Sequence, residues 1–176
     1  MLEDRGFTLT HQRVALELAF SGALAGYTEL TVSPTTAALR SIFLNARRAK
    51  IQKVTCNGHE AVYDYLASEH AALTDVHDYP KTKRAIYSSA SETAFGELRI
   101  QLPDAVRPEA VAPGEATGEE GFAAITVRVD YLLEDVREAI QLVLPTPEAP
   151  YKVPHLYTRP TGPDSARCWV PCVDTL

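Results

Sequence analysis

The sequence predicts a mainly β fold built from short antiparallel strands. Apolar residues alternate with polar ones through most of the chain, and a period of two is typical of a half-buried strand. Proline, glycine and one Asn-Gly dipeptide punctuate these runs at short intervals, as turns do. Two stretches, 67–95 and 103–121, lack the alternation. We therefore expect many short strands and little helix.

The first two predicted strands form a hairpin. Apolar and polar residues alternate from Arg13 to Phe20 and again from Tyr27 to Ser33. A short glycine-containing connection separates the runs, and Pro34 ends the second because proline has no amide hydrogen for a sheet ladder. The residues of the first run that we place on the inner face are Val14, Leu16 and Leu18.

Shorter alternating runs predict the remaining strands, at 41–46, 50–56, 60–65, 98–102, 125–131, 141–144 and 155–158. Asn57-Gly58 precedes the third of these runs. This dipeptide favours a type I′ hairpin turn because both residues tolerate a positive φ. In the run 125–131, the residues predicted to face the core are Ile125, Val127 and Val129.

Three segments interrupt the strands. Residues 67–95 and 103–121 are predicted to be irregular or mobile insertions; the second is rich in Pro, Ala, Gly and Glu. Residues 145–154 are dense in proline and are interpreted as a linker. The 176 residues fit one β-domain, 1–176. Because the sequence stops within what looks like a continuing domain, we expect it to be a fragment of a larger protein.

Composition narrows the function classes. The net charge of −6 argues against nucleic-acid binding by this domain alone. No apolar run approaches the about 18 residues of a membrane helix, so no membrane partner is predicted. Three cysteines fit a reducing compartment better than a disulfide-stapled domain.

No local motif predicts an active site. The string His59-Glu60-Ala61-Val62-Tyr63 resembles a zinc-peptidase motif, but that motif needs a helix and a second histidine, whereas this string follows a turn and alternates like a strand. Cys168 and Cys172, four apart on an extended chain, would lie about 13 Å from each other, too far to share a metal ion. We predict no catalytic residue, metal, cofactor or small-molecule substrate.

The end of the sequence resembles a known family. Ala166-Arg167, Pro171-Cys172 and Asp174 match the segment of M1 aminopeptidases that reads Asp-Ala-Arg-x-x-Phe-Pro-Cys-Phe-Asp-Glu-Pro. Residues 26–32, 41–46 and 51–58 are similar to three strands of the same family's N-terminal domain. The resemblance implies an antiparallel, multi-sheet β-saddle or sandwich, as in that domain.

Two further segments, 7–14 and 169–175, look like the non-catalytic branch of the family found among the TBP-associated factors of the transcription factor TFIID. A substrate-binding glutamine of active enzymes is replaced by Arg159 or Pro160, depending on one gap. The resemblance implies a nuclear scaffold, not an enzyme, that supports complex assembly and RNA polymerase II promoter recognition. It also implies association with TFIID subunits 1, 8 and 10. Contact with promoter DNA is expected only through the whole complex.

Two alternatives remain open on the sequence. The chain could be the N-terminal domain of an active zinc aminopeptidase, cut before its catalytic domain. It could also be a stand-alone β-sandwich interaction module. The residues after Leu176 separate the first alternative from the scaffold, because an enzyme needs a His-Glu-x-x-His motif there.

Three residues near the end are predicted to pin the last strand into the core: Trp169, Pro171 and Cys172. If Trp169 is buried, replacing it with alanine lowers the free energy of unfolding by roughly 3–5 kcal/mol. Thermal melting of the Trp169→Ala variant measures this loss, and an unchanged midpoint excludes Trp169 from the core.

Overall fold

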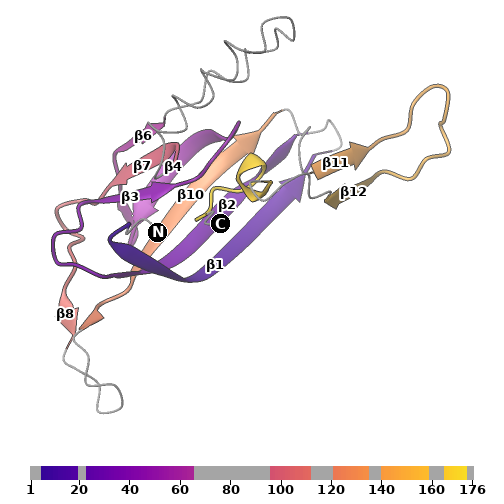
Figure 1. Ribbon diagram of the computed structural model, residues 1–176. Helices are drawn as coiled ribbons and strands as arrows, with labels where there is room; N and C mark the ends of the chain where they lie inside the picture. The colour runs from indigo at the N-terminus through magenta and orange to yellow at the C-terminus, as the bar shows by residue number, and fades with distance from the viewer. Residues whose placement is uncertain are drawn as a thin grey trace, which may run out of the picture.

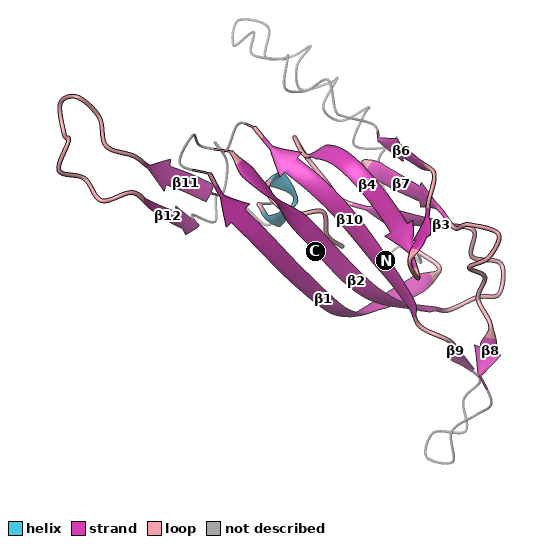
Figure 2. Cartoon of the chain, turned by 180° about the vertical axis from the view of Figure 1, so that it is seen from behind, coloured by secondary structure: helices cyan, strands magenta, loops and turns pink. Residues whose placement is uncertain are grey.

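The computed structural model describes residues 5–19, 23–65, 96–111, 121–134, 140–158 and 165–173. These residues form mainly antiparallel strands distributed over several sheets, which confirms the predicted fold class (Figures 1 and 2). The strands are β1 Phe7–Leu18, β2 Leu24–Pro34, β3 Ser41–Leu44, β4 Lys50–Cys56, β5 His59–Glu60, β6 Tyr63–Tyr65, β7 Leu98–Gln101, β8 Ala110–Val111, β9 Gly121–Phe122, β10 Ile125–Leu133, β11 Ile140–Val143 and β12 His155–Thr158. A single 3-10 turn, η3 Ala166–Cys168, follows them in the described part of the chain.

The main sheet has the strand order β1-β2-β10-β4-β5, and each described pairing in it is antiparallel. The predicted hairpin of β1 and β2 is present. β1 starts at Phe7, earlier than predicted. A bulge between Leu9 and His11 shifts the alternation of the strand by one residue. Because of this shift, simple period-two alternation predicts only the second half of the strand.

A second sheet, of order β3-β7-β6, shares one apolar core with the main sheet. The inner residues of both sheets are fully buried there, including Leu30 and Val127 from the main sheet and Ile42 and Ile100 from the second, all 0% exposed. Residues that alternate with them on β10 are less buried. The arrangement explains the sequence pattern, because one face of each strand meets the other sheet.

A separate apolar cluster closes the other end of the main sheet. It joins Leu24 and Leu133, at the ends of β2 and β10, to Ile140 at the start of β11. Val170 and Cys172, from the last described residues of the chain, complete it. This cluster therefore ties the projecting β11–β12 pair and the end of the chain to the main sheet.

The turn at Asn57-Gly58 has the predicted backbone, with φ of 47° and 81°. The Asn57 side chain also accepts the Thr126 N–H at 2.8 Å, which fixes the turn to β10. The return strand predicted at 60–65 is instead two strands. β5 pairs with β4 in the main sheet, whereas β6 pairs with β7 in the second sheet. The chain crosses between the sheets through Ala61 and Val62.

The interruptions predicted from composition have different outcomes. Residues 67–95 lie outside the described residues. The segment 103–121 contains β8 and, at its end, the start of β9, which pair as a small separate sheet. Residues 145–154, interpreted as a linker, form the tip of the β11–β12 hairpin instead, with Thr146 and Ala149 bridged to each other. Among the described residues, no helix has the length and apolar character needed to cross a membrane.

The backbone just before β7 requires a glycine at position 96. Its φ is +121°, and a Cβ atom there would lie 2.3 Å from the carbonyl oxygen of Leu44. We expect Gly96→Ala to lower the free energy of unfolding by about 3 kcal/mol or more, because both the strained φ and the backbone contact oppose a side chain.

Chemical denaturation measures this loss, with Gly121→Ala as the matched control. A Cβ at Gly121 meets nothing within 4 Å, and the control should change stability little. Equal stability of the two variants would contradict the assignment.

Candidate functional site

The residues predicted to face the core are mostly, but not all, buried. Ile125, Val127 and Val129 are at most 2% exposed. Leu16 is partly buried and packs against the second apolar cluster. Val14 lies on the inner face, where the register places it opposite the buried Thr28, but its side chain is 39% exposed. β1 is an edge strand, so its inner face extends beyond the layer that covers β2. The side chain of Leu18 lies outside what the structure describes.

The last described residues, 165–173, form a terminal segment that differs from the predicted strand. Cys168 belongs to η3, and the extended chain resumes with a single bridge between Cys172 and Asn45. Pro171 and Cys172 are buried, whereas Trp169 is partly buried. The expected loss for Trp169→Ala therefore falls below the range for a fully buried tryptophan.

Backbone hydrogen bonds attach the terminal segment to the residues that follow β3. Asn45 and Cys172 exchange two bonds, of 2.8 and 2.9 Å, between their N–H and C=O groups. The Arg47 N–H donates to the carbonyl of Arg167 at 2.7 Å. The terminal segment thus extends the edge of the second sheet from a distant part of the sequence.

Two side chains attach the same segment to the main sheet. The Tyr131 hydroxyl donates to the carbonyl of Trp169 at 3.0 Å. The Gln12 side-chain amide donates to the carbonyl of Pro171 at 3.1 Å and to the Thr28 hydroxyl at 2.9 Å. The terminal segment therefore bridges both sheets.

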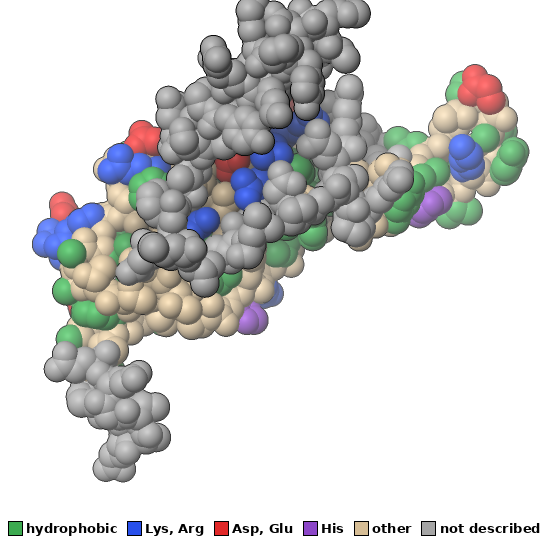
Figure 3. Space-filling model, in the orientation of Figure 1, with side chains coloured by type: hydrophobic (Ala, Val, Ile, Leu, Met, Phe, Trp, Pro, Cys, Tyr) green, Lys and Arg blue, Asp and Glu red, His purple; other side chains and the backbone are tan. Residues whose placement is uncertain are grey.

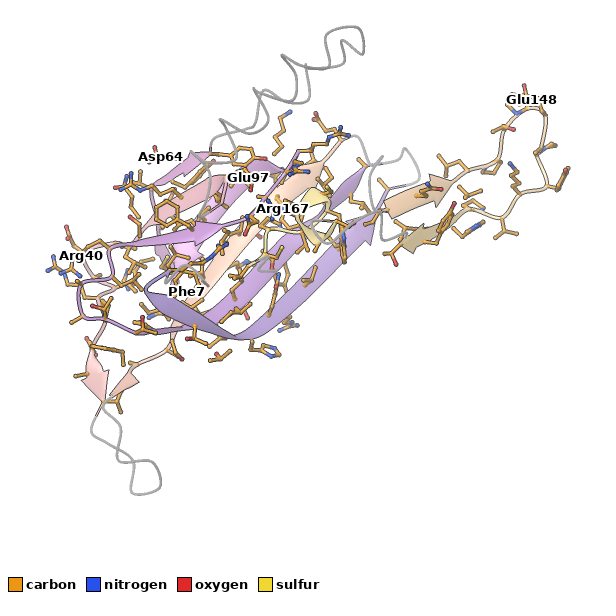
Figure 4. All side chains as sticks on the ribbon, in the orientation of Figure 1. Phe7, Arg40, Asp64, Glu97, Glu148 and Arg167 are labelled. Carbon is orange, nitrogen blue, oxygen red and sulfur yellow. The ribbon has the colours of Figure 1, made fainter. Side chains whose placement is uncertain are left out.

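A buried carboxylate lies at this junction. Glu97 is 5% exposed, and its Oε2 atom accepts the Ala46 N–H at 3.0 Å. Its Oε1 atom lies 3.7 Å from Nη1 of Arg167 (Figure 4). A buried charge is tolerated only with such partners. Glu97 therefore joins the residues after β3 to the terminal segment, and this role explains its position in the core.

Burial favours the neutral form of three further ionisable side chains. Burial raises the pKa of the Cys56 thiol to about 12. Burial, with a smaller contribution from the charge of Glu97, raises the pKa of Tyr65 to about 12. Burial also raises the pKa of Tyr131, assisted by nearby Cys172. A neutral thiol is a poor nucleophile and a poor metal ligand, so the surroundings of Cys56 suit packing and not reaction.

The zinc-peptidase-like string does not form the helix that the motif needs, and Ala61 and Val62 in its middle lie between two strands. His59 and Glu60 form the exposed strand β5, and Tyr63 begins β6 in the other sheet. Within the described ranges, no group of three or more His, Cys, Asp or Glu side chains could hold a metal ion. No disulfide joins Cys56, Cys168 and Cys172 to one another.

The β11–β12 pair projects from the body of the domain as an arm (Figure 1). One face of the arm packs on the second apolar cluster through Ile140 and Leu156. The register places Gln141 opposite Tyr157 and Val143 opposite His155, so these four residues share the other face. Tyr157 donates a hydrogen bond to Gln141, and its ring stacks with that of His155. These contacts order the outer face of the arm.

This outer face and the arm tip gather exposed apolar side chains (Figure 3). Tyr151 is 82% exposed, Val153 75% and Tyr157 43%. Among the described residues, six large hydrophobic side chains are exposed, and half of them lie here. Clustered exposed apolar groups are typical of protein contact sites. We refer to Tyr151, Val153 and Tyr157 as the arm patch.

Sequence reasoning missed the arm patch and Glu97. The proline-rich composition of 145–154 masked a hairpin tip, although the alternation of 155–158 was visible. Glu97 follows Gly96 directly before a strand, and a Gly-Glu pair at that position was the available signal.

Comparison with solved structures defines the class of fold. The chain superposes on yeast leukotriene A4 hydrolase in complex with bestatin with a TM-score of 0.60, covering 99% of this chain and 22% of that chain at 13% identity. The native enzyme from Saccharomyces cerevisiae gives a TM-score of 0.59 with the same identity and coverage. The fold is that of the N-terminal β-domain of M1 aminopeptidases. No family model matches the chain.

Sequence comparison identifies a particular relative. The chain is homologous to transcription initiation factor TFIID subunit 2. It is 30% identical over 187 residues to the Drosophila melanogaster protein, which covers 98% of this chain, and 28% identical over 185 residues to the Danio rerio protein, which covers 97%. The chain spans about 14% of the length of these curated relatives.

Glu97 provides a test of the junction. We expect Glu97→Ala to lower the free energy of unfolding by about 2 kcal/mol, because the buried N–H of Ala46 loses its acceptor. Glu97→Gln keeps an oxygen that can accept the Ala46 N–H. It should lower the free energy of unfolding by about 1 kcal/mol or less, because the ion pair that it removes, with Arg167, is long. Urea denaturation compares the two, and an equal loss would show that the N–H bond is not the main contribution.

Proposed function

We propose that this domain is a non-catalytic scaffold within a TFIID-type transcription factor subunit, acting in the nucleus by protein contact. Homology to TFIID subunit 2 over 97% of the chain carries the proposal. In this proposal the domain supports assembly of the complex and, through the complex, RNA polymerase II promoter recognition. The partners proposed from the family resemblance are TFIID subunits 1, 8 and 10.

The arm patch is the proposed contact surface. It combines aromatic and aliphatic side chains, and one of them, Tyr157, is already ordered by its contacts with Gln141 and His155, so binding that ring costs little conformational entropy. Tyrosines are enriched at protein interfaces because the ring is apolar and the hydroxyl is polar. A position on a projecting hairpin lets another subunit reach the outer face of the arm and its tip.

Direct DNA binding by this domain is not part of the proposal. Besides the net charge of −6, several basic side chains are paired with acidic neighbours. Lys50 lies 2.9 Å from Glu134, and Arg128 lies 2.7 Å from Asp130 and over the ring of Tyr27. The hydrogen bond to Asp130 raises the pKa of Arg128 further, against a smaller opposing effect of burial. Promoter contact would come from basic surface elsewhere in the complex.

The fold match to leukotriene A4 hydrolase favours one second candidate, the N-terminal domain of an active zinc aminopeptidase. Zinc analysis of the purified full-length protein separates the two. Stoichiometric zinc together with peptidase activity would favour the enzyme.

The scaffold proposal predicts the effect of changing the arm patch in the full-length protein. We expect Tyr151→Ser combined with Val153→Ser to reduce the TFIID subunits recovered with TBP from nuclear extract by several-fold, because apolar contact area is lost. Mass spectrometry with labelled standards measures the recovery.

Val62→Ser is the matched control, since Val62 is 68% exposed and lies in the crossing between the sheets. It should leave recovery unchanged. Absence of the unmodified protein from TBP precipitates would refute the TFIID assignment. Full recovery of the arm variant would refute the arm patch as the contact.

A further inference from the structure

β1 is the open edge of the main sheet. It stands first in the order β1-β2-β10-β4-β5, and its residues, apart from Thr10 at the bulge, pair on one side with β2. Figures 1 and 2 show, from opposite sides, that no described element lies along its outer edge. A long open edge offers unpaired backbone groups to another strand. The bulge near Thr10 protects the first half of β1, whereas residues 11–18 continue in unbroken register.

The backbone groups on this edge can be assigned. The Ala19 N–H donates to the carbonyl of Ala23 at 2.9 Å, directly beyond the end of the β1–β2 ladder. Hydrogen-bonded and non-hydrogen-bonded pairs alternate in an antiparallel ladder, so the odd-numbered residues from 13 to 17 bond to β2. The residues whose N–H and C=O groups point away from β2 are Gln12, Val14 and Leu16.

The side chains of β1 complement a reversed copy of the same strand. In a two-fold antiparallel pairing centred on Ala15, Arg13 stands opposite Glu17 of the second copy, and Val14 stands opposite Leu16 of the second copy. Arg13 and Glu17 are exposed, and neither forms an ion pair with another described residue. Val14 is 39% exposed on the inner face. The pairing therefore makes opposite-charge pairs on one face and apolar pairs on the other.

We propose that two copies of this chain associate through their β1 strands, forming one continuous antiparallel sheet with the two-fold axis at Ala15. The hydrogen bonds between the copies come from the backbone N–H and C=O groups of Gln12, Val14 and Leu16 that point away from β2. In this register, Val14 of one copy forms a hydrogen-bonded pair with Leu16 of the other. A strand pair of this length buries less than the about 1,200 Å² of a standard stable interface. The dimer is consequently weak and depends on protein concentration.

Charge reversal tests the pairing in the 176-residue chain. Sedimentation equilibrium of the unmodified chain should show a monomer–dimer equilibrium. Arg13→Glu and Glu17→Arg each place like charges opposite each other, and each should raise the dimer dissociation constant about tenfold. An equal mixture of the two variants restores both opposite-charge pairs, so a heterodimer should form with the affinity of the unmodified chain. Circular dichroism confirms that each variant keeps the β fold.

A cysteine cross-link tests the register independently. The variant Ala15→Cys, made in a Cys168→Ser background, places one thiol of each copy at the two-fold axis. The two residues form a non-hydrogen-bonded pair, whose Cα atoms lie about 4.5 Å apart. A disulfide can span this Cα–Cα distance. Mild oxidation should give a covalent dimer. Thr8→Cys, an exposed position on the same strand before the bulge, is the control and should not cross-link.

A chain that stays monomeric at every concentration overturns the proposal. So does a mixture of the two charge variants that associates no better than either alone. Capture of an unrelated strand by the β1 edge, without self-association, would assign the edge to a different partner and equally overturn it.

Discussion

The position of β10 between β2 and β4 is the constraint on which the rest of the domain depends. Its inward residues Ile125, Val127, Val129, Tyr131 and Leu133 are each at most 2% exposed. The first three belong to the core shared by the two sheets, and the last two belong to the second apolar cluster. One strand therefore unites both clusters, and β2 and β4 are held in register on either side of it. Burial of this row of apolar side chains stabilises the domain.

The ionisable groups in the interior serve assembly of the fold. Tyr131 and Glu97 connect backbone groups that lie far apart in the sequence. The surface features suited to function are apolar or open-edged: the arm patch and the outer side of β1. This division supports the proposed role of the domain in protein contact.

Much of the fold could be predicted from period-two alternation, because most strands here bury one face. β4 matches its predicted bounds, and β10 needs only two more residues. Prediction failed where the alternation and the tertiary structure diverge. The bulge changed the phase of β1, and the crossing at Ala61 and Val62 divided one run between two sheets. Val14 shows that a residue can face inward and still be exposed when its strand is at an edge. The role of Glu97 could not be predicted because its partners, Ala46 and Arg167, come from remote segments.

The hydrogen bond between Gln12 and Pro171 joins residues 159 positions apart. Val170 and Cys172 fill the second cluster from the same end of the chain. During synthesis, the hairpin of β1 and β2 emerges from the ribosome long before the residues that cover its inner face. Part of the inner face of the main sheet therefore stays uncovered until translation has passed this point, and uncovered apolar surface favours aggregation during folding.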